Sequence, residues 1–195
     1  MDDYDAAEIL RLMREARQKT RGYASFFGWG IDRDLEELGP VQELAKALLA
    51  SDGERLLALK LRGRGNDPPD IEAVNALGER VAVEVTELVD GDAIQAHKRG
   101  DRYAYAEWTR ESFLGKLQTL LSGKAARLPK LKDAPYPGGY VIVVFTDEPM
   151  LDPDTVSSFL AGAVFKDLGR CRAYLLLSYW PKTEAYPFFS LPAGA

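Results

Sequence analysis

The first half of the chain alternates short apolar runs with turn-forming residues, a pattern typical of β-strands. The runs are "RLLALKLRG" at 55–63, "DIEAV" at 70–74 and "RVAVEVTEL" at 80–88. The segment between the second and third runs, "NALGE" at 75–79, contains an asparagine and a glycine, which favour turns. We therefore predict three consecutive strands, of which the last two form a hairpin.

Three further apolar runs follow in the second half. The run "YVIVVFT" at 140–146 is continuous and β-branched, as in a central strand buried on both faces. "CRAYLLLSY" at 171–179 has a similar pattern. "YPFFSL" at 186–191 carries Pro187, which cannot donate a backbone hydrogen bond and therefore favours an edge strand.

Apolar residues at helical spacing predict four helices, at residues 4–19, 40–50, 105–128 and 152–164. Pro40 suits the first position of the second helix, and Pro129 ends the third. We interpret the polar stretch at 90–103 as a connection. The Gly-rich, aromatic segment "GYASFFGWGI" at 22–31 is interpreted as a packed loop or a partner surface.

The resulting order is α, α, β, β, β, α, β, α, β, β, which fits an α/β fold with a mixed sheet and helices on both faces. The length of 195 residues suits a single domain. We divide it into an N-terminal helix and aromatic loop at 1–33, a core at 40–146, and a C-terminal extension of the sheet at 147–195.

Composition excludes several classes of site and protein. A single cysteine and a single histidine exclude a disulfide framework and Cys- or His-rich metal sites. The formal net charge of −5 argues against a general nucleic-acid coat protein, which would be basic. The chain has no run of 18 apolar residues, the length that a membrane-spanning helix needs. Its N-terminus is acidic where a secretory signal would be basic. We therefore expect a cytoplasmic protein without a membrane partner.

Two acidic residues stand on the predicted hairpin. Asp70 begins one strand and Glu84 lies within the next, on the opposite face from Val81, Val83 and Val85. A hairpin can bring the two carboxylates together, where they repel each other unless a proton or cation lies between them. Because oxygen ligands favour Mg²⁺ or Mn²⁺, we predict that Asp70 and Glu84 bind one of these ions.

The helix predicted at 105–128 contributes a lysine to the same region. Its apolar stripe is formed by Phe113, Leu117, Leu120, Leu121 and Leu128. Lys124 falls inside this stripe, and a buried ammonium needs a partner. We therefore predict that Lys124 turns toward the sheet and approaches Glu84 or Thr86, whereas Lys116 lies at the edge of the stripe.

The sequence "PPD" at 68–70, followed after thirteen residues by "EVT" at 84–86, resembles the motif of the PD-(D/E)XK nuclease superfamily. That superfamily has the core order α-β-β-β-α-β, which matches residues 40–146. By this resemblance Asp70 and Glu84 are metal-binding, catalytic carboxylates, and the metal activates a water and steadies charge on the phosphate. The lysine position of the motif holds Thr86 instead. Some members carry a catalytic residue on the core helix, where this chain has Lys124.

A basic band surrounds the predicted site. Between residues 96 and 132 there are nine Lys or Arg residues and three acidic residues. Such bands bind phosphate backbones. We name Gln95, Lys98 and Lys116 as candidate substrate-binding residues.

The leading hypothesis is a Mg²⁺- or Mn²⁺-dependent nuclease that hydrolyses phosphodiester bonds in DNA or RNA, with Asp70, Glu84 and Lys124 as catalytic residues. A second hypothesis, favoured by Thr86 at the lysine position, is a nuclease-like fold that binds nucleic acid or a protein without cutting. A third is an interaction protein, for example an immunity-like partner, that uses the acidic surface and the aromatic residues at 26–29. The sequence leaves a homodimer open.

Overall fold

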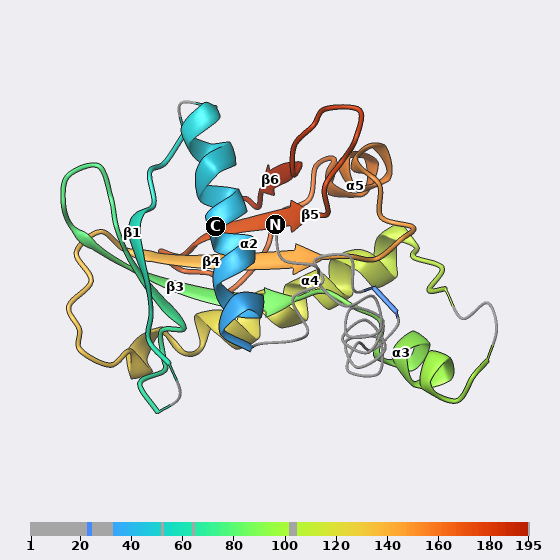
Figure 1. The fold of residues 1–195 in the computed structure, drawn as a ribbon, viewed down its shortest axis with the longest axis horizontal. Coiled ribbons are helices and arrows are strands. Elements are labelled where there is room, and N and C mark those ends of the chain that lie inside the picture. Colours follow the sequence, from blue (N-terminus) through green and yellow to red (C-terminus); the bar gives the residue numbers. More distant parts are fainter. Residues whose placement is uncertain (1–22, 25–32, 52, 64, 102–104, 195) are drawn as a thin grey trace, which may run out of the picture.

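The computed structural model describes residues 23–24, 33–51, 53–63, 65–101 and 105–194 of the chain. The predicted helix at 4–19 lies outside these residues. So does the aromatic loop at 22–31, except for Tyr23 and Ala24. Within the described residues the chain forms a mixed α/β fold, in which one sheet has helices on both faces (Figure 1).

The sheet has six strands, which lie side by side in their order along the chain. They are β1 (Leu57–Leu61), β2 (Ile71–Val74), β3 (Arg80–Glu87), β4 (Tyr140–Thr146), β5 (Arg172–Leu177) and β6 (Phe188–Ser190). The strands β1, β2 and β3 pair antiparallel, β3, β4 and β5 pair parallel, and β6 returns antiparallel at the edge. This arrangement confirms the mixed sheet, the β2–β3 hairpin and the edge position of the last strand.

The helices in the described residues are α2 (Arg33–Ala50), α3 (Gly91–Lys98), α4 (Arg110–Ala125) and α5 (Pro153–Leu160), with a short 3₁₀ helix, η1 (Leu128–Lys130). The helix α2 crosses one face of the sheet, while α4 lies on the other and connects the parallel strands β3 and β4 (Figure 1). No helix in the described part of the chain is both long and apolar enough to cross a bilayer. From α2 to β4 the order matches the predicted α-β-β-β-α-β core, with α3 added.

Three predicted helices, at 40–50, 105–128 and 152–164, were wrong in their limits, and one helix was not predicted. The last of the three, α5, keeps its predicted Asp152 cap but ends at Leu160. The helix α2 begins at Arg33 and contains Pro40 in its interior, because good helix formers before the proline outweigh one missing hydrogen bond. The polar stretch predicted as a connection contains α3. The Asp90 side chain starts this helix by accepting hydrogen bonds from the backbone N–H groups of Asp92 and Ala93.

The helix α4 is shorter than predicted, because both of its ends have local stops. Thr109 and Ser112 form a capping box at its start. At its other end α4 stops at Ala125, and Pro129 falls within η1. Leu128 is therefore outside the helix and 36% exposed, so its predicted place in the apolar stripe was wrong.

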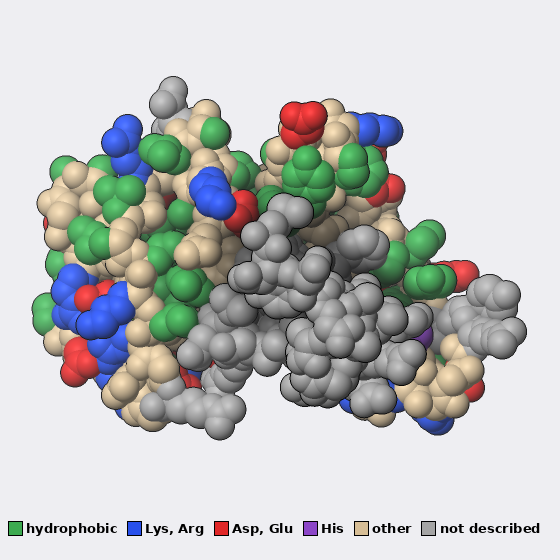
Figure 2. All heavy atoms as spheres, viewed as in Figure 1, with side chains coloured by type: hydrophobic (Ala, Val, Ile, Leu, Met, Phe, Trp, Pro, Cys, Tyr) green, Lys and Arg blue, Asp and Glu red, His purple; other side chains and the backbone are tan. Residues whose placement is uncertain are grey.

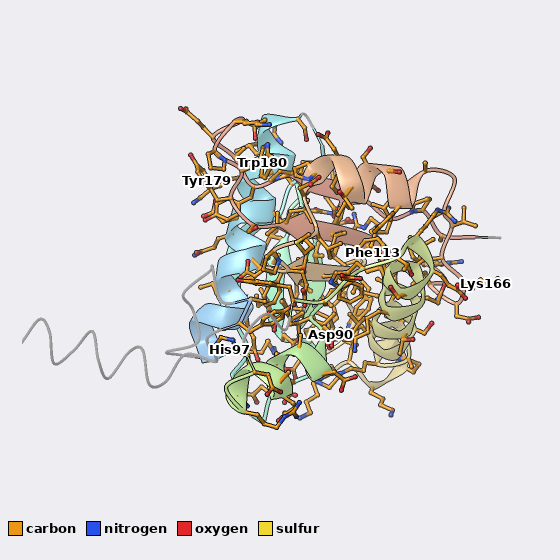
Figure 3. All side chains as sticks on the ribbon, turned by 90° about the vertical axis from the view of Figure 1, so that its right-hand side faces the viewer. Asp90, His97, Phe113, Lys166, Tyr179 and Trp180 are labelled. Atoms are coloured by element: carbon orange, nitrogen blue, oxygen red, sulfur yellow. The ribbon has the colours of Figure 1, made fainter. Side chains whose placement is uncertain are left out.

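The sheet is buried on both faces, by two separate apolar cores. In β3, Val81, Val83 and Val85 face α2, while Ala82 and Leu88 face α4. The helix α4 buries three side chains against the second face, Phe113, Leu117 and Leu121. Figure 3 shows Phe113 between α4 and the sheet. The side chain of Glu84, on the α4 face of β3, is thus held away from water.

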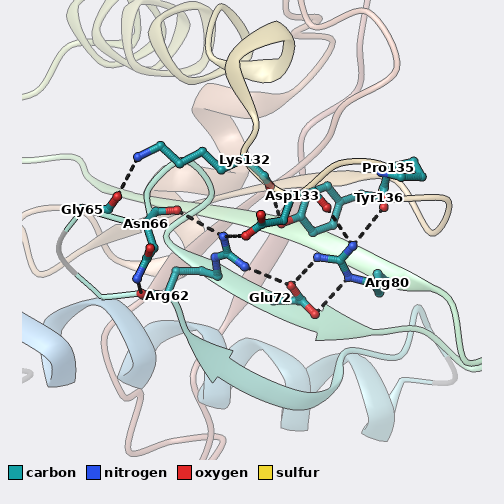
Figure 4. Close-up of polar contacts among 9 residues, drawn as sticks. All are labelled: Arg62, Gly65, Asn66, Glu72, Arg80, Lys132, Asp133, Pro135 and Tyr136. Carbon is teal, nitrogen blue, oxygen red and sulfur yellow. Dashed lines mark hydrogen bonds and ion pairs between the residues drawn. The ribbon is translucent and has the colours of Figure 1, made fainter.

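A polar network fixes the segment that follows η1 against the strands (Figure 4). Arg80 donates hydrogen bonds to both carboxylate oxygens of Glu72, at 3.1 and 2.7 Å, and to the Asp133 carbonyl at 2.8 Å. Its guanidinium also stacks on the ring of Tyr136, 4.5 Å from the centroid. Arg62 forms ion pairs with Glu72 and Asp133. Charged side chains of both signs gather over this end of the molecule (Figure 2).

Candidate active site

The β2–β3 hairpin brings the two predicted carboxylates together. Ile71 pairs with Val83, which sets the preceding Asp70 beside Glu84. The Asp70 carboxylate is held in place because the backbone N–H of Val85 donates a 2.8 Å hydrogen bond to Oδ2. Asp70 is 5% exposed and Glu84 is fully buried. Two acidic groups with so little exposure need positive partners.

The first of these partners is Lys124, in the last turn of α4. Its Nζ donates hydrogen bonds to Asp70 Oδ2 at 2.9 Å and to Glu84 Oε2 at 2.6 Å. Its position follows from the helical period, since it lies one turn beyond Leu121 on the buried side of α4. The backbone carbonyl of Lys124 accepts a 2.9 Å hydrogen bond from the Tyr140 hydroxyl. The predicted approach of Lys124 to Glu84 is confirmed.

A second cation, Arg127, enters the cluster and was not predicted as a site residue. Its Nη1 lies 2.9 Å from Glu84 Oε2 and 3.9 Å from Asp70 Oδ1. Its Nη2 lies 3.4 Å from Asp67 Oδ2. The sequence did carry a signal, because Arg127 follows Lys124 by three residues, roughly one helical turn. Arg127 was counted only in the basic band and was not placed beside Lys124.

The electrostatics of the two carboxylates differ. Burial raises the pKa of Glu84 to about 7, an effect that the nearby charge of Asp70 reinforces and that Lys124 and Arg127 only partly offset. Burial also acts to raise the pKa of Asp70. There the charge and hydrogen bond of Lys124, together with the Val85 N–H, outweigh burial and hold the pKa below its usual value. The same cluster thus shifts the pKa values of the two acids in opposite directions, that of Glu84 upward and that of Asp70 downward.

The oxygen atoms present fit a hard divalent cation. Glu84 Oε1 is buried and has no hydrogen-bond partner within the described residues. These residues contain no group of three or more His, Cys, Asp or Glu side chains suited to a metal. Mg²⁺ commonly uses only one or two carboxylates and completes its shell with water and substrate phosphate. Asp70 and Glu84 would hold it, with Glu84 Oε1 as the carboxylate oxygen that has no hydrogen-bond partner in the described residues.

The other predicted site residues lie apart from this cluster. Gln95 and Lys98 are exposed on α3, which lies at the opposite end of the molecule from β1 and the β2–β3 hairpin (Figure 1). Lys116 is exposed on α4, two turns before Lys124. Thr86 is half-buried, two residues after Glu84 on β3. The structure therefore brings together Asp70, Glu84 and Lys124 but not the three candidate substrate-binding residues.

The aromatic residues near the C-terminus, of which Tyr179 is exposed and Trp180 is partly buried, are also separate from the cluster. Tyr179 and Trp180 lie on the side of the molecule where α2 lies (Figure 3). The ring of Tyr179 packs against that of Tyr186 at 5.6 Å between centroids. These rings are thus on a different side of the sheet from Lys124.

Comparisons with known proteins give no family assignment. No protein-family model matches the chain, and no curated protein matches it. Among solved structures, the chain is similar to SfsA from Pyrococcus furiosus in complex with Ca²⁺, with 16% sequence identity and a TM-score of 0.31. The match covers 80% of this chain and 64% of that one, so the chain spans less than two thirds of that protein. A likeness of this size is too small to place the chain in a family.

Proposed function

We propose that this protein is a metal-dependent nuclease that hydrolyses phosphodiester bonds, with Asp70 and Glu84 holding Mg²⁺ or Mn²⁺. The observation that carries the proposal is the convergence of two buried carboxylates from adjacent strands with a lysine from the facing helix. A bound metal of this kind supplies an activated water and stabilises charge on the phosphate.

The residues of the chain have separable tasks in this proposal. Asp70 is oriented by the Val85 N–H, so one of its oxygens is fixed before any ligand binds. Glu84 keeps Oε1 without a hydrogen-bond partner in the described residues, which leaves a lone pair for a cation. Lys124 places an ammonium within hydrogen-bond distance of both acids, where it can stabilise negative charge that develops on a substrate phosphate.

A second candidate function is a nuclease-like module that binds nucleic acid without cutting it. The observation that favours it is the balance of charge, because Lys124 and Arg127 together match the charges of Asp70 and Glu84. Such a cluster holds itself together without any metal. The threonine at position 86, where the motif has a lysine, also favours this second function.

Hydrolysis assays separate the two functions. Labelled single- and double-stranded DNA and RNA are incubated with the full chain and Mg²⁺ or Mn²⁺, and the wild type is compared with Glu84→Gln. The matched control is Glu111→Gln, which changes an exposed glutamate in the first turn of α4. Metal-dependent cleavage that Glu84→Gln removes and Glu111→Gln keeps supports the nuclease. Retained binding without cleavage, in the wild type with either metal, supports the binding module instead.

A further inference from the structure

We propose that Arg127 is a phosphate-binding residue, whose guanidinium contacts the backbone of a nucleic acid entering the Asp70–Glu84–Lys124 cluster. This inference rests on the proposed function, which it deepens by naming a contact to the substrate. It concerns a residue that neither the motif nor the apolar stripe of α4 identified.

Arg127 reaches from the buried floor of the cluster to its edge. It contacts Glu84, which has no exposure, and Asp67, whose side chain is 38% exposed. The Arg127 side chain is itself 29% exposed, compared with 15% for Lys124. Arg127 is therefore the outer of the two cations and the one that an incoming ligand meets first.

The contacts of the guanidinium differ in length. The ion pair with Glu84 is 2.9 Å, the hydrogen bond to Asp67 is 3.4 Å, and the Asp70 carboxylate lies 3.9 Å away. A phosphate oxygen can replace the hydrogen bond to Asp67 while the ion pair with Glu84 keeps the guanidinium in place. The planar fork of arginine suits this division, because it presents donors along two edges at once.

The charges around Arg127 also favour an anion at this edge. Lys130 and Lys132 follow on the same segment and are exposed. Lys132 donates hydrogen bonds from Nζ to the Gly65 carbonyl and from its backbone N–H to the Pro68 carbonyl, at 2.7 and 2.8 Å. These bonds hold the lysines beside the loop that carries Asp67. The acidic neighbour Asp133 is neutralised by its ion pair with Arg62.

The test measures binding in the absence of metal, so that cleavage does not interfere. Fluorescence anisotropy with EDTA follows a labelled single-stranded DNA and a labelled single-stranded RNA across a range of salt concentrations. Arg127→Gln is expected to weaken binding about tenfold and to lower the slope of log K against log salt by about 0.7, the value for one phosphate contact on a single strand. Arg170→Gln, at an exposed arginine, is the matched control and keeps both values.

A double-mutant cycle distinguishes a phosphate contact from general charge effects. Asp67→Asn removes the acidic group that competes for Arg127, so it should tighten binding in the wild type and have a smaller effect in Arg127→Gln. Arg127→Lys, which keeps the charge, should recover the salt slope. If Arg127→Gln shows no cooperative thermal unfolding, the cycle is run with the neutral variant Arg127→Met, and a smaller effect of Asp67→Asn in that background supports the contact.

Unchanged affinity and slope in Arg127→Gln would overturn the inference, as would an equal effect of Asp67→Asn in both backgrounds. Failure of the wild type to bind either strand would also overturn it. Arg127-dependent binding without any cleavage would leave the inference standing and remove the proposed function. If Arg127→Gln cleaves and binds like the wild type, the proposed function stands and the inference about Arg127 is overturned.

Discussion

The substitution Lys124→Met tests the cluster most directly, because methionine is an unbranched side chain of nearly the same length that lacks the ammonium group. In the wild type, Lys124 donates hydrogen bonds to Asp70 at 2.9 Å and to Glu84 at 2.6 Å, and both carboxylates are almost fully buried. After the change Asp70 and Glu84 face each other with Arg127 as the cation that remains in contact with both. We expect a less stable fold and a slower reaction.

The size of the effect follows from these contacts. Hydrogen bonds to charged groups contribute about 1.5–3 kcal/mol each, and loss of one partner of a buried ion pair costs about 3–5 kcal/mol. Because Arg127 still neutralises Glu84, we expect the free energy of unfolding to fall by about 2–4 kcal/mol. For a chain of this size that lowers Tm by roughly 5–15 °C. Loss of one charge-stabilising group should lower hydrolysis by about a hundredfold or more.

Thermal unfolding with and without Mn²⁺, together with cleavage rates, measures both effects. Mn²⁺ should raise the Tm of Lys124→Met more than that of the wild type, because a cation between the carboxylates replaces the lost ammonium. Lys116→Met is the matched control, since it removes an exposed lysine from the same helix and should change stability by less than about 0.5 kcal/mol. Equal Tm values and equal rates for the two variants would refute the assignment of Lys124. A rate loss in Lys116→Met alone would show that the wrong lysine was chosen.

Three further outcomes are expected. Calorimetry with Mn²⁺ should show binding that Asp70→Asn removes, and equal heats for the two proteins would contradict the metal site. Thr109→Ala should lower the free energy of unfolding by about 1 kcal/mol in urea, because the capping box of α4 is lost. Arg80 lowers the pKa of Glu72, so this ion pair stabilises the fold above the usual glutamate pKa of about 4.3, and the contribution disappears as pH falls further. The stability difference between wild type and Glu72→Gln, from urea midpoints, should therefore be larger at pH 7 than at pH 3.

Strands were easier to predict from the sequence than helix limits, and the reason is local. Each strand in the described residues carries a run of apolar or β-branched side chains with turn residues beside it, so the pattern alone indicates it. The helix α3 has almost no apolar face and is started by the Asp90 cap, which periodicity does not detect. The start of α2 was missed because Pro40, read as a first helical residue, lies inside the helix.

At the site, the sequence could identify residues that point inward but not those that arrive from outside regular structure. Glu84 and Lys124 were predictable because strand and helix periods fix their directions. Arg127 lies between α4 and η1, where no period applies. Gln95 was chosen because it lies shortly after the third predicted strand, and Lys98 because it belongs to the basic band. The start of α3 instead leads them away from the cluster (Figure 1).

The topology explains why a helix lysine can stand where the motif expects one from a strand. Antiparallel pairing of β2 and β3 sets Asp70 beside Glu84, while the parallel pairing of β3 and β4 requires a crossover, and α4 is that crossover. The crossover must return over the face of β3 that carries Glu84, so the last turn of α4 ends above the carboxylates. Lys124 lies in that turn, and its ammonium therefore reaches both Asp70 and Glu84. The crossover helix thus supplies a cation to two acids that the hairpin has already brought together.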